Sequence, residues 1–167
     1  DPAQTNDYLG YLRESVEAAK HIGALSVSIH SNVLGEGGVV LNRYEGLSFT
    51  VKTCAMFRGL LACADIAEQS GIAMNLEPLN ITTDHAGNFL TSSRTATELC
   101  DLVGSPMLNI LFDVYHMQLN EGSLCDNLTA CAHRLGHIHV ADAPGRREPG
   151  TGEIRYTKVF AHLETIG

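Results

Sequence analysis

A short alternating stretch at residues 25–30, which reads LSVSIH, decides the fold class of this chain. Apolar side chains occupy every second position, so the stretch is predicted to form a β-strand with one apolar and one polar face. Helices are predicted on both sides of it, over 6–20 and 50–69, because apolar residues there recur at spacings of three and four. Gly23 and Gly71 follow these helices, as is common at helix ends.

The same succession of strand and helix continues to the end of the chain. Three further strands are predicted, each followed by a helix. The strands cover 72–79, 108–115 and 136–141, and the helices cover 93–103, 122–134 and 155–166. Strands that alternate with helices of this length are typical of βαβ units and a parallel sheet. We therefore predict an α/β fold, with residues 1–167 in a single domain.

The composition excludes several classes of protein. Hydrophobic residues make up 44% of the 167 positions and charged residues 18%, which excludes an intrinsically disordered chain. No apolar stretch approaches the ~20 residues of a membrane span, so we expect no membrane partner. The net charge of −8 opposes binding to nucleic acid, whose partners rely on Lys and Arg. The five cysteines include no CxxC pair, which favours free thiols and a cytoplasmic location.

The polar face of each predicted strand ends in an ionisable residue. These residues are His30, Glu77, Asp113 and His139. Parallel strands buried on both faces are normally apolar throughout, so four polar faces in succession need a shared, hydrated space. In a (β/α) barrel, the carboxyl ends of the strands carry the active site. We therefore expect the four side chains to converge there.

Two of the four residues are carboxylates that need a partner if they are buried. Buried carboxylates require a cation or a network of donors, and a divalent metal would satisfy Glu77, Asp113 and His139 together. Two oxygen ligands with one imidazole suit Mg²⁺ or Mn²⁺ better than a closed zinc site. The alternative interpretation is a set of separate polar residues, each satisfied by its neighbours.

Three stretches resemble the hydroxypyruvate isomerase family, which belongs to the superfamily of xylose isomerase-like TIM barrels. They are NLEPLN at 75–80, FDVYHMQ at 112–118 and HIHVADAPGRREPGTGEI at 137–154, of which the last is the most specific. The resemblance covers essentially the whole chain and implies a (β/α)8 TIM barrel. Such a barrel takes about 250 residues. Residues 1–167 would then be a partial barrel, about strands four to seven with their helices, truncated at both ends.

The resemblance also implies roles for individual residues. Glu77 would be both a metal ligand and the catalytic acid/base, with Asp113 and His139 as further ligands. His116 would orient substrate oxygens, and Arg146 or Arg147 would bind the polar or anionic end of the substrate. We place His30 with these substrate-binding residues.

The chain departs from the family pattern in two places. Hydroxypyruvate isomerases often carry Gln where this chain has His139, whereas sugar epimerases of the superfamily carry His. The family also uses a second glutamate on the last strand, for which this sequence offers no candidate. Glu153 lies in a predicted loop and Glu164 in the last predicted helix, so neither can replace it. We therefore expect the fragment alone to be inactive.

The function implied is that of a metal-dependent aldose–ketose isomerase that acts through a cis-enediolate. The reaction expected is hydroxypyruvate to tartronate semialdehyde, so the partner is a small hydroxy-keto acid or sugar, with a homo-oligomer left open. A ketose 3-epimerase is the alternative enzyme, and a non-catalytic sugar-binding relic of the barrel is the alternative outside the enzymes. An endonuclease IV-like phosphodiesterase is disfavoured by the negative charge.

Two loops are expected to lie near the substrate. The glycine-rich segment 35–38 contains Glu36, which opposes phosphate binding, so we interpret it as a flexible loop over the mouth of the site. His85, in the loop after Glu77, is a candidate for approaching the substrate.

Overall fold

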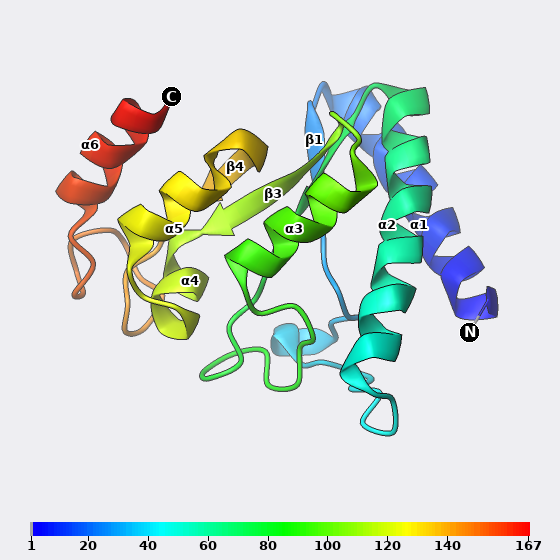
Figure 1. The fold of residues 1–167 in the computed structure, drawn as a ribbon, viewed down its shortest axis with the longest axis horizontal. Coiled ribbons are helices and arrows are strands. Elements are labelled where there is room, and N and C mark those ends of the chain that lie inside the picture. The colour runs from blue at the N-terminus through cyan, green and yellow to red at the C-terminus, as the bar shows by residue number, and fades with distance from the viewer. Residues whose placement is uncertain (1) are drawn as a thin grey trace.

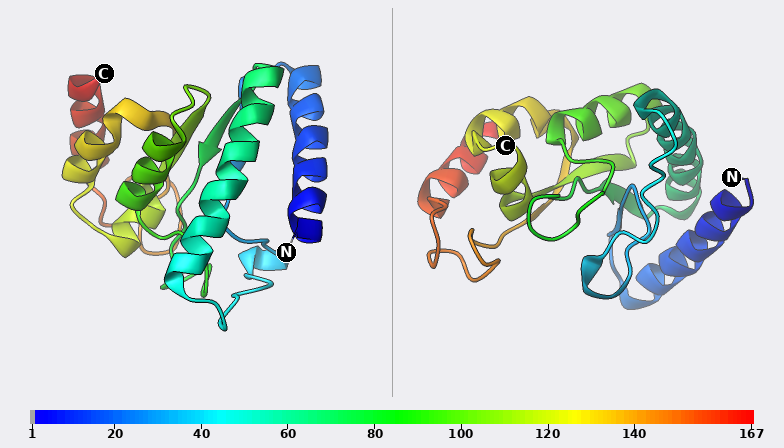
Figure 2. Two further views of the ribbon diagram at one scale, coloured as in Figure 1. Left: turned by 45° about the vertical axis from the view of Figure 1, so that its right-hand side comes forward. Right: turned by 90° about the horizontal axis from the view of Figure 1, so that it is seen from below.

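The computed structural model describes residues 2–167, which form one parallel sheet with helices around its outer side (Figures 1 and 2). The sheet has four strands in the order β1-β2-β3-β4, so each strand pairs with its neighbours in sequence. The strands are β1 (Ser26–Ile29), β2 (Ala73–Leu76), β3 (Leu108–Asp113) and β4 (Leu135–His139). This arrangement is that of part of a TIM barrel, as the sequence predicts.

The helices lie before, between and after the strands and cover the convex side of the sheet (Figure 2). They are α1 (Pro2–Ile22), α2 (Phe49–Ser70), α3 (Ser93–Val103), α4 (Val114–Asn120), α5 (Leu124–Cys131) and α6 (Tyr156–Ile166), with 3-10 turns at Glu36–Gly38 and Ala132–Arg134. Local sequence sets their ends. Ser92, for example, caps α3 by accepting a hydrogen bond from the Thr95 amide, and Gly104 ends the helix in the left-handed conformation.

The core lies between the helices and the apolar face of the sheet. Met74, Leu76, Ile110 and Phe112 are fully buried in it. The parallel register pairs Ile29 with Leu76 and Asp113 with His139, and this places the carboxyl ends of the strands along one edge of the sheet. The polar residues at the carboxyl ends of the four strands are therefore brought close together along this edge.

The structure corrects several predicted boundaries. The strand predicted at 72–79 is the shorter β2, and the strand predicted at 136–141 is β4, which begins and ends earlier. The first helix begins at Pro2 rather than at residue 6, and the predicted helix 122–134 is a shorter α5 followed by a 3-10 turn. The predicted strand 108–115 ends at Asp113, because the carboxylate of Asp113 accepts hydrogen bonds from the amides of Tyr115 and His116 and starts α4.

Two observations bear on the environment of the chain. All five cysteines are free thiols, as the sequence predicts. Among the described residues, no helix combines the length and apolar character that a bilayer crossing requires.

Candidate active site

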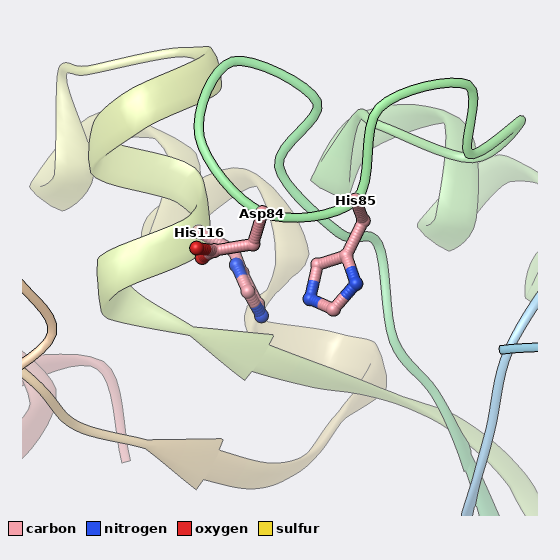
Figure 3. A group of neighbouring side chains, drawn as sticks. All are labelled: Asp84, His85 and His116. Atoms are coloured by element: carbon pink, nitrogen blue, oxygen red, sulfur yellow. The ribbon is translucent and has the colours of Figure 1, made fainter. Parts of the chain in front are cut away.

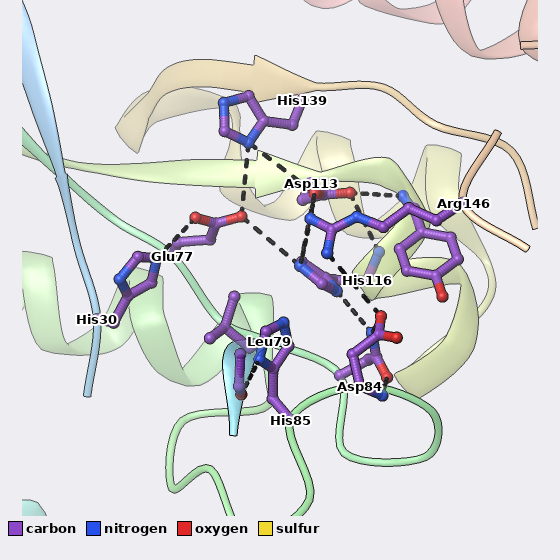
Figure 4. A network of polar contacts seen from close by, with 12 residues as sticks. His30, Glu77, Leu79, Asp84, His85, Asp113, His116, His139 and Arg146 are labelled. Atoms are coloured by element: carbon purple, nitrogen blue, oxygen red, sulfur yellow. Dashed lines mark hydrogen bonds and ion pairs between the residues drawn. The ribbon is translucent and has the colours of Figure 1, made fainter. Parts of the chain in front are cut away.

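Two groups of metal-ligating side chains lie close together among the described residues. One consists of Asp84, His85 and His116 (Figure 3), and the other of Glu77, Asp113 and His139 (Figure 4). Both groups lie at the carboxyl edge of the sheet, where the polar faces of the strands end.

The strand ends position the second group. Asp113 and His139 are the last residues of β3 and β4, and they are paired with each other on these two neighbouring strands. Glu77 directly follows β2, and its amide donates to the carbonyl of Ile29 at 3.0 Å, which continues the pairing of β1 with β2. His30 follows β1 in the same way. The predicted convergence of the four residues is thus observed (Figure 4).

Each buried carboxylate has one oxygen already engaged. Glu77 and Asp113 are only 4% and 2% exposed. The Oε2 atom of Glu77 lies 3.0 Å from Nε2 of His30. The Oδ1 atom of Asp113 accepts from the amides of Tyr115 and His116 at 2.8 and 3.2 Å. These contacts fix the orientation of both carboxylates and leave one oxygen of each for another partner.

The atoms that remain form a compact set. His139 Nδ1 lies 3.6 Å from Glu77 Oε1 and 3.9 Å from Asp113 Oδ2. One ligand atom from each residue lies within 4.8 Å of the others. Two carboxylate oxygens and an imidazole nitrogen are suitable ligands for a hard divalent cation. The donor set therefore fits a metal ion, and His139, whose side chain is 46% exposed, marks its open side.

Glu77 is held in its charged form. Burial raises the pKa of Glu77, but the hydrogen bond and charge of His30 outweigh it, with further help from His116 and His139. The net result is a pKa below the ordinary value of 4.5. Glu77 is therefore a carboxylate at neutral pH, which is the form that can bind a cation or accept a proton.

His116 lies at the first turn of α4 and is fully buried. Its Nε2 atom is 3.6 Å from Asp113 Oδ2 and 3.9 Å from Glu77 Oε1. Burial is the main cause that lowers the pKa of His116, and Arg146 adds to it, whereas Asp113 and Glu77 oppose it. His116 thus presents a neutral imidazole to the same space as the two carboxylates.

Of the two candidate arginines, only Arg146 reaches this space. Its Nη2 atom lies 3.6 Å from Asp113 Oδ2 and 3.3 Å from His116 Nε2, and its guanidinium stacks over the ring of Tyr115. Arg147 is exposed, and its backbone carbonyl accepts from the amide of Asp142. The structure thus places Arg146 beside His116 and leaves Arg147 outside the cluster.

Asp142 organises the loop that carries Arg146. Its buried carboxylate accepts hydrogen bonds from the amides of Ala143, Gly150 and Ile154. Burial opposes ionisation, yet these amides lower the pKa of Asp142 below its ordinary value. Sequence reasoning missed this role, although Asp142 stands directly before the Pro/Gly-rich segment of the most specific motif.

The first group, Asp84, His85 and His116, does not form a comparable opening (Figure 3). The side-chain amide nitrogen of Asn80 lies 2.9 Å from Asp84 Oδ2 and 2.7 Å from His116 Nδ1. It therefore occupies the position between two of the three ligands. The third, His85, bonds to the carbonyl of Gly38 through Nδ1 at 2.8 Å. We assign no metal ion to this group.

A parallel α/β sheet with ionisable side chains gathered at its carboxyl edge defines a TIM-barrel type of site. Comparison with known families makes this specific: the family of xylose isomerase-like TIM barrels matches residues 1–167, and the chain belongs to it.

The chain is similar to several proteins of known name. It is 40% identical over 109 residues to hydroxypyruvate isomerase of Escherichia coli (strain K12), which covers 65% of this chain and 42% of that protein. It is 35% identical over 108 residues to 2-oxo-tetronate isomerase of Cupriavidus necator, covering 65% and 41%. The chain thus matches less than half the length of each. A solved D-psicose 3-epimerase from Clostridium cellulolyticum H10 shares the fold, with a TM-score of 0.86, 18% identity and coverage of 100% and 55%.

Proposed function

We propose that this chain carries the site of a metal-dependent aldose–ketose isomerase that interconverts hydroxypyruvate and tartronate semialdehyde through a cis-enediolate. One observation carries the proposal. The possible ligand atoms of Glu77, Asp113 and His139 face the same space as the nitrogen donors of His116 and Arg146. The similarity to proteins named hydroxypyruvate isomerase and 2-oxo-tetronate isomerase supports the choice of reaction.

Glu77, Asp113 and His139 would hold the cation, for which Mg²⁺ or Mn²⁺ fits the donor set. When bound, a divalent cation supplies positive charge that stabilises developing negative charge on substrate oxygens. The chain contributes the preformed geometry, because the second oxygen of each carboxylate is already tied to His30 or to backbone amides.

The reaction moves one proton between adjacent carbons. Removal of a proton from C3 of hydroxypyruvate gives the cis-enediolate, and return of a proton to C2 gives tartronate semialdehyde. The proton on the C3 hydroxyl oxygen is transferred to the C2 oxygen. Glu77 is the group we assign to the carbon-bound proton, because its low pKa keeps it in the base form.

His116 and Arg146 would bind substrate oxygens. His116 Nε2 and Arg146 Nη2 lie 3.3 Å apart, and both face the space beside Asp113. An arginine there suits the carboxylate of a keto acid, since the guanidinium can donate two parallel hydrogen bonds. His30 would act through Glu77, which it contacts. Arg147 is exposed and, within the described part of the chain, lies outside the cluster, so we assign it no role in binding.

A ketose 3-epimerase is the second candidate. His139 favours it, because the sugar epimerases that this chain resembles carry histidine at that position, whereas hydroxypyruvate isomerases often carry glutamine. Turnover assays of the full-length protein with hydroxypyruvate, tartronate semialdehyde and simple ketoses separate the two reactions. We expect turnover of the two keto acids, loss of turnover with a chelator, and recovery with Mg²⁺ or Mn²⁺. Binding of substrate analogues without turnover of any compound would instead support the non-catalytic alternative.

A further inference from the structure

Asn80 is a buried residue at the centre of the polar network, and the isomerase chemistry described above does not use it. It lies four residues after β2 and is 0% exposed. Its side chain contacts the loop that follows it and the ring of His116 on α4. Buried amides of this kind need partners for both the oxygen and the nitrogen.

The orientation of the Asn80 amide follows from its neighbours. One end of the amide lies 3.0 and 3.2 Å from the backbone nitrogens of Thr83 and Asp84, which can only donate. That end must therefore be the oxygen. The other end is the NH₂ group, and one of its hydrogens is taken by Asp84 Oδ2 at 2.9 Å.

The second hydrogen of this NH₂ group points at His116. The nitrogen lies 2.7 Å from Nδ1 of the imidazole, a short hydrogen bond. A donor at this distance requires a lone pair on Nδ1. A neutral imidazole has one protonated and one unprotonated nitrogen, so the proton of His116 lies on Nε2.

The Nε2–H group is directed at the reaction space. It faces Asp113 Oδ2 at 3.6 Å and Glu77 Oε1 at 3.9 Å, both beyond normal hydrogen-bond length. Its other neighbour is Arg146 Nη2 at 3.3 Å, which also can only donate and therefore competes with Asn80 for the single lone pair of the neutral ring. We assign the lone pair to Nδ1 because its contact with Asn80, at 2.7 Å, is the shorter of the two. Two donors side by side, with no acceptor at bonding distance among the described residues, are arranged to receive an oxygen atom from a ligand.

We propose that Asn80 is a positioning residue that fixes the proton of His116 on Nε2, so that this nitrogen donates a hydrogen bond to a substrate oxygen. The role in catalysis rests on the isomerase function proposed above, whereas the position of the proton does not. The opposite tautomer would present a lone pair to the negatively charged oxygen of the enediolate. Asn80 excludes that arrangement.

The proton position can be measured directly by NMR in the protein labelled with ¹⁵N at histidine, at a pH where the imidazole is neutral. The His116 signals are assigned from their loss in His116→Gln. We expect a pyridine-like signal for Nδ1 and a pyrrole-like signal for Nε2. A protonated Nδ1 in the unmodified protein would overturn the proposal, and this readout needs neither metal nor turnover.

Two substitutions test the role of the amide. Asn80→Asp keeps an oxygen for the amides of Thr83 and Asp84 but faces Nδ1 with an acceptor, so we expect a proton on Nδ1. Asn80→Ser removes the donor and is expected to give a mixture of tautomers. In both, kcat should fall about 10- to 100-fold with a smaller change in KM, because the lost hydrogen bond strengthens in the transition state.

Asn120→Ser is the matched control. Asn120 holds the same loop by donating to the carbonyls of Leu79 and Thr91, and no hydrogen bond joins it to His116. If Asn80 only supports the loop, Asn80→Ser and Asn120→Ser should lower kcat equally and leave the tautomer unchanged, which would refute the proposal. An Nε2–H tautomer in a protein that does not turn over hydroxypyruvate would leave the proton assignment intact and refute the proposed reaction.

Discussion

The contact between Gly38 and His85 offers a sharp test of how the loops around the site are held. Gly38 has a φ of +77°, and its carbonyl receives the hydrogen bond from His85 Nδ1 at 2.8 Å. A Cβ atom on Gly38 would lie 2.6 Å from Cε1 and 2.9 Å from Nδ1 of His85, closer than real side chains approach. We therefore expect Gly38→Ala to displace the imidazole.

The neighbouring glycine provides the control. Gly37 has a φ of +66°, and a Cβ atom there would meet nothing within 4 Å. An alanine at either position costs about 1–2 kcal/mol for the left-handed backbone. Gly38→Ala also loses the His85 hydrogen bond, which is worth about 1 kcal/mol. The free energy of unfolding should therefore fall by about 1–2 kcal/mol in Gly37→Ala and by about 2–3 kcal/mol in Gly38→Ala.

The assay is unfolding of both variants in urea. The dependence of the unfolding free energy on urea concentration is held equal for the two, so that the urea concentration at the midpoint of unfolding reports their stability. A second readout is KM for hydroxypyruvate, because the His85 ring packs edge-on at 5.3 Å from that of His116. We expect KM to rise in Gly38→Ala and to stay close to that of the unmodified protein in Gly37→Ala. Equal stability and equal KM in the two variants would refute the reasoning.

Two further predictions follow from the charges of the site. Arg146→Lys should raise KM for a keto acid about 10- to 100-fold through loss of the two-pronged contact, whereas Arg147→Lys should leave KM unchanged in the same steady-state assay. Glu77 has a folded-state pKa below its unfolded value of 4.5, so its contribution to stability is present above pH 4.5 and is lost as the pH falls through the folded pKa. Urea unfolding across acidic pH should therefore show a steeper loss of stability in the unmodified protein than in Glu77→Gln, and parallel curves would contradict the assigned pKa direction.

Much of the fold was predictable because the signals are local. The period of two in 25–30, 72–79, 108–115 and 136–141 defines strands whose polar positions share one face, and parallel pairing then brings their ends together. The ionisable residues at those ends could be selected on this basis alone. The distances between these side chains depend on how neighbouring strands are aligned, and the alternation of apolar and polar residues does not determine that alignment.

The parts that were missed depend on contacts between segments far apart in sequence. Val114 and Tyr115 continue the strand pattern, so the start of α4 at Val114 is visible only once the carboxylate of Asp113 is seen to bond the following amides. Asn80 looks like an ordinary loop residue until it is placed against His116, 36 residues away. Asp142 organises its loop by accepting hydrogen bonds from backbone amides, one of which belongs to a residue 12 positions later in the sequence.

The central claim is that Glu77 transfers the carbon-bound proton of a hydroxy-keto acid, and isotope exchange tests it most directly. The full-length protein is incubated in D₂O with hydroxypyruvate and Mg²⁺ or Mn²⁺, and deuterium at C3 is followed by NMR. We predict exchange in the unmodified protein and a decrease of about 10²- to 10⁴-fold in Glu77→Gln, the range expected for loss of a general base. Exchange that continues at the unmodified rate in Glu77→Gln would contradict the account.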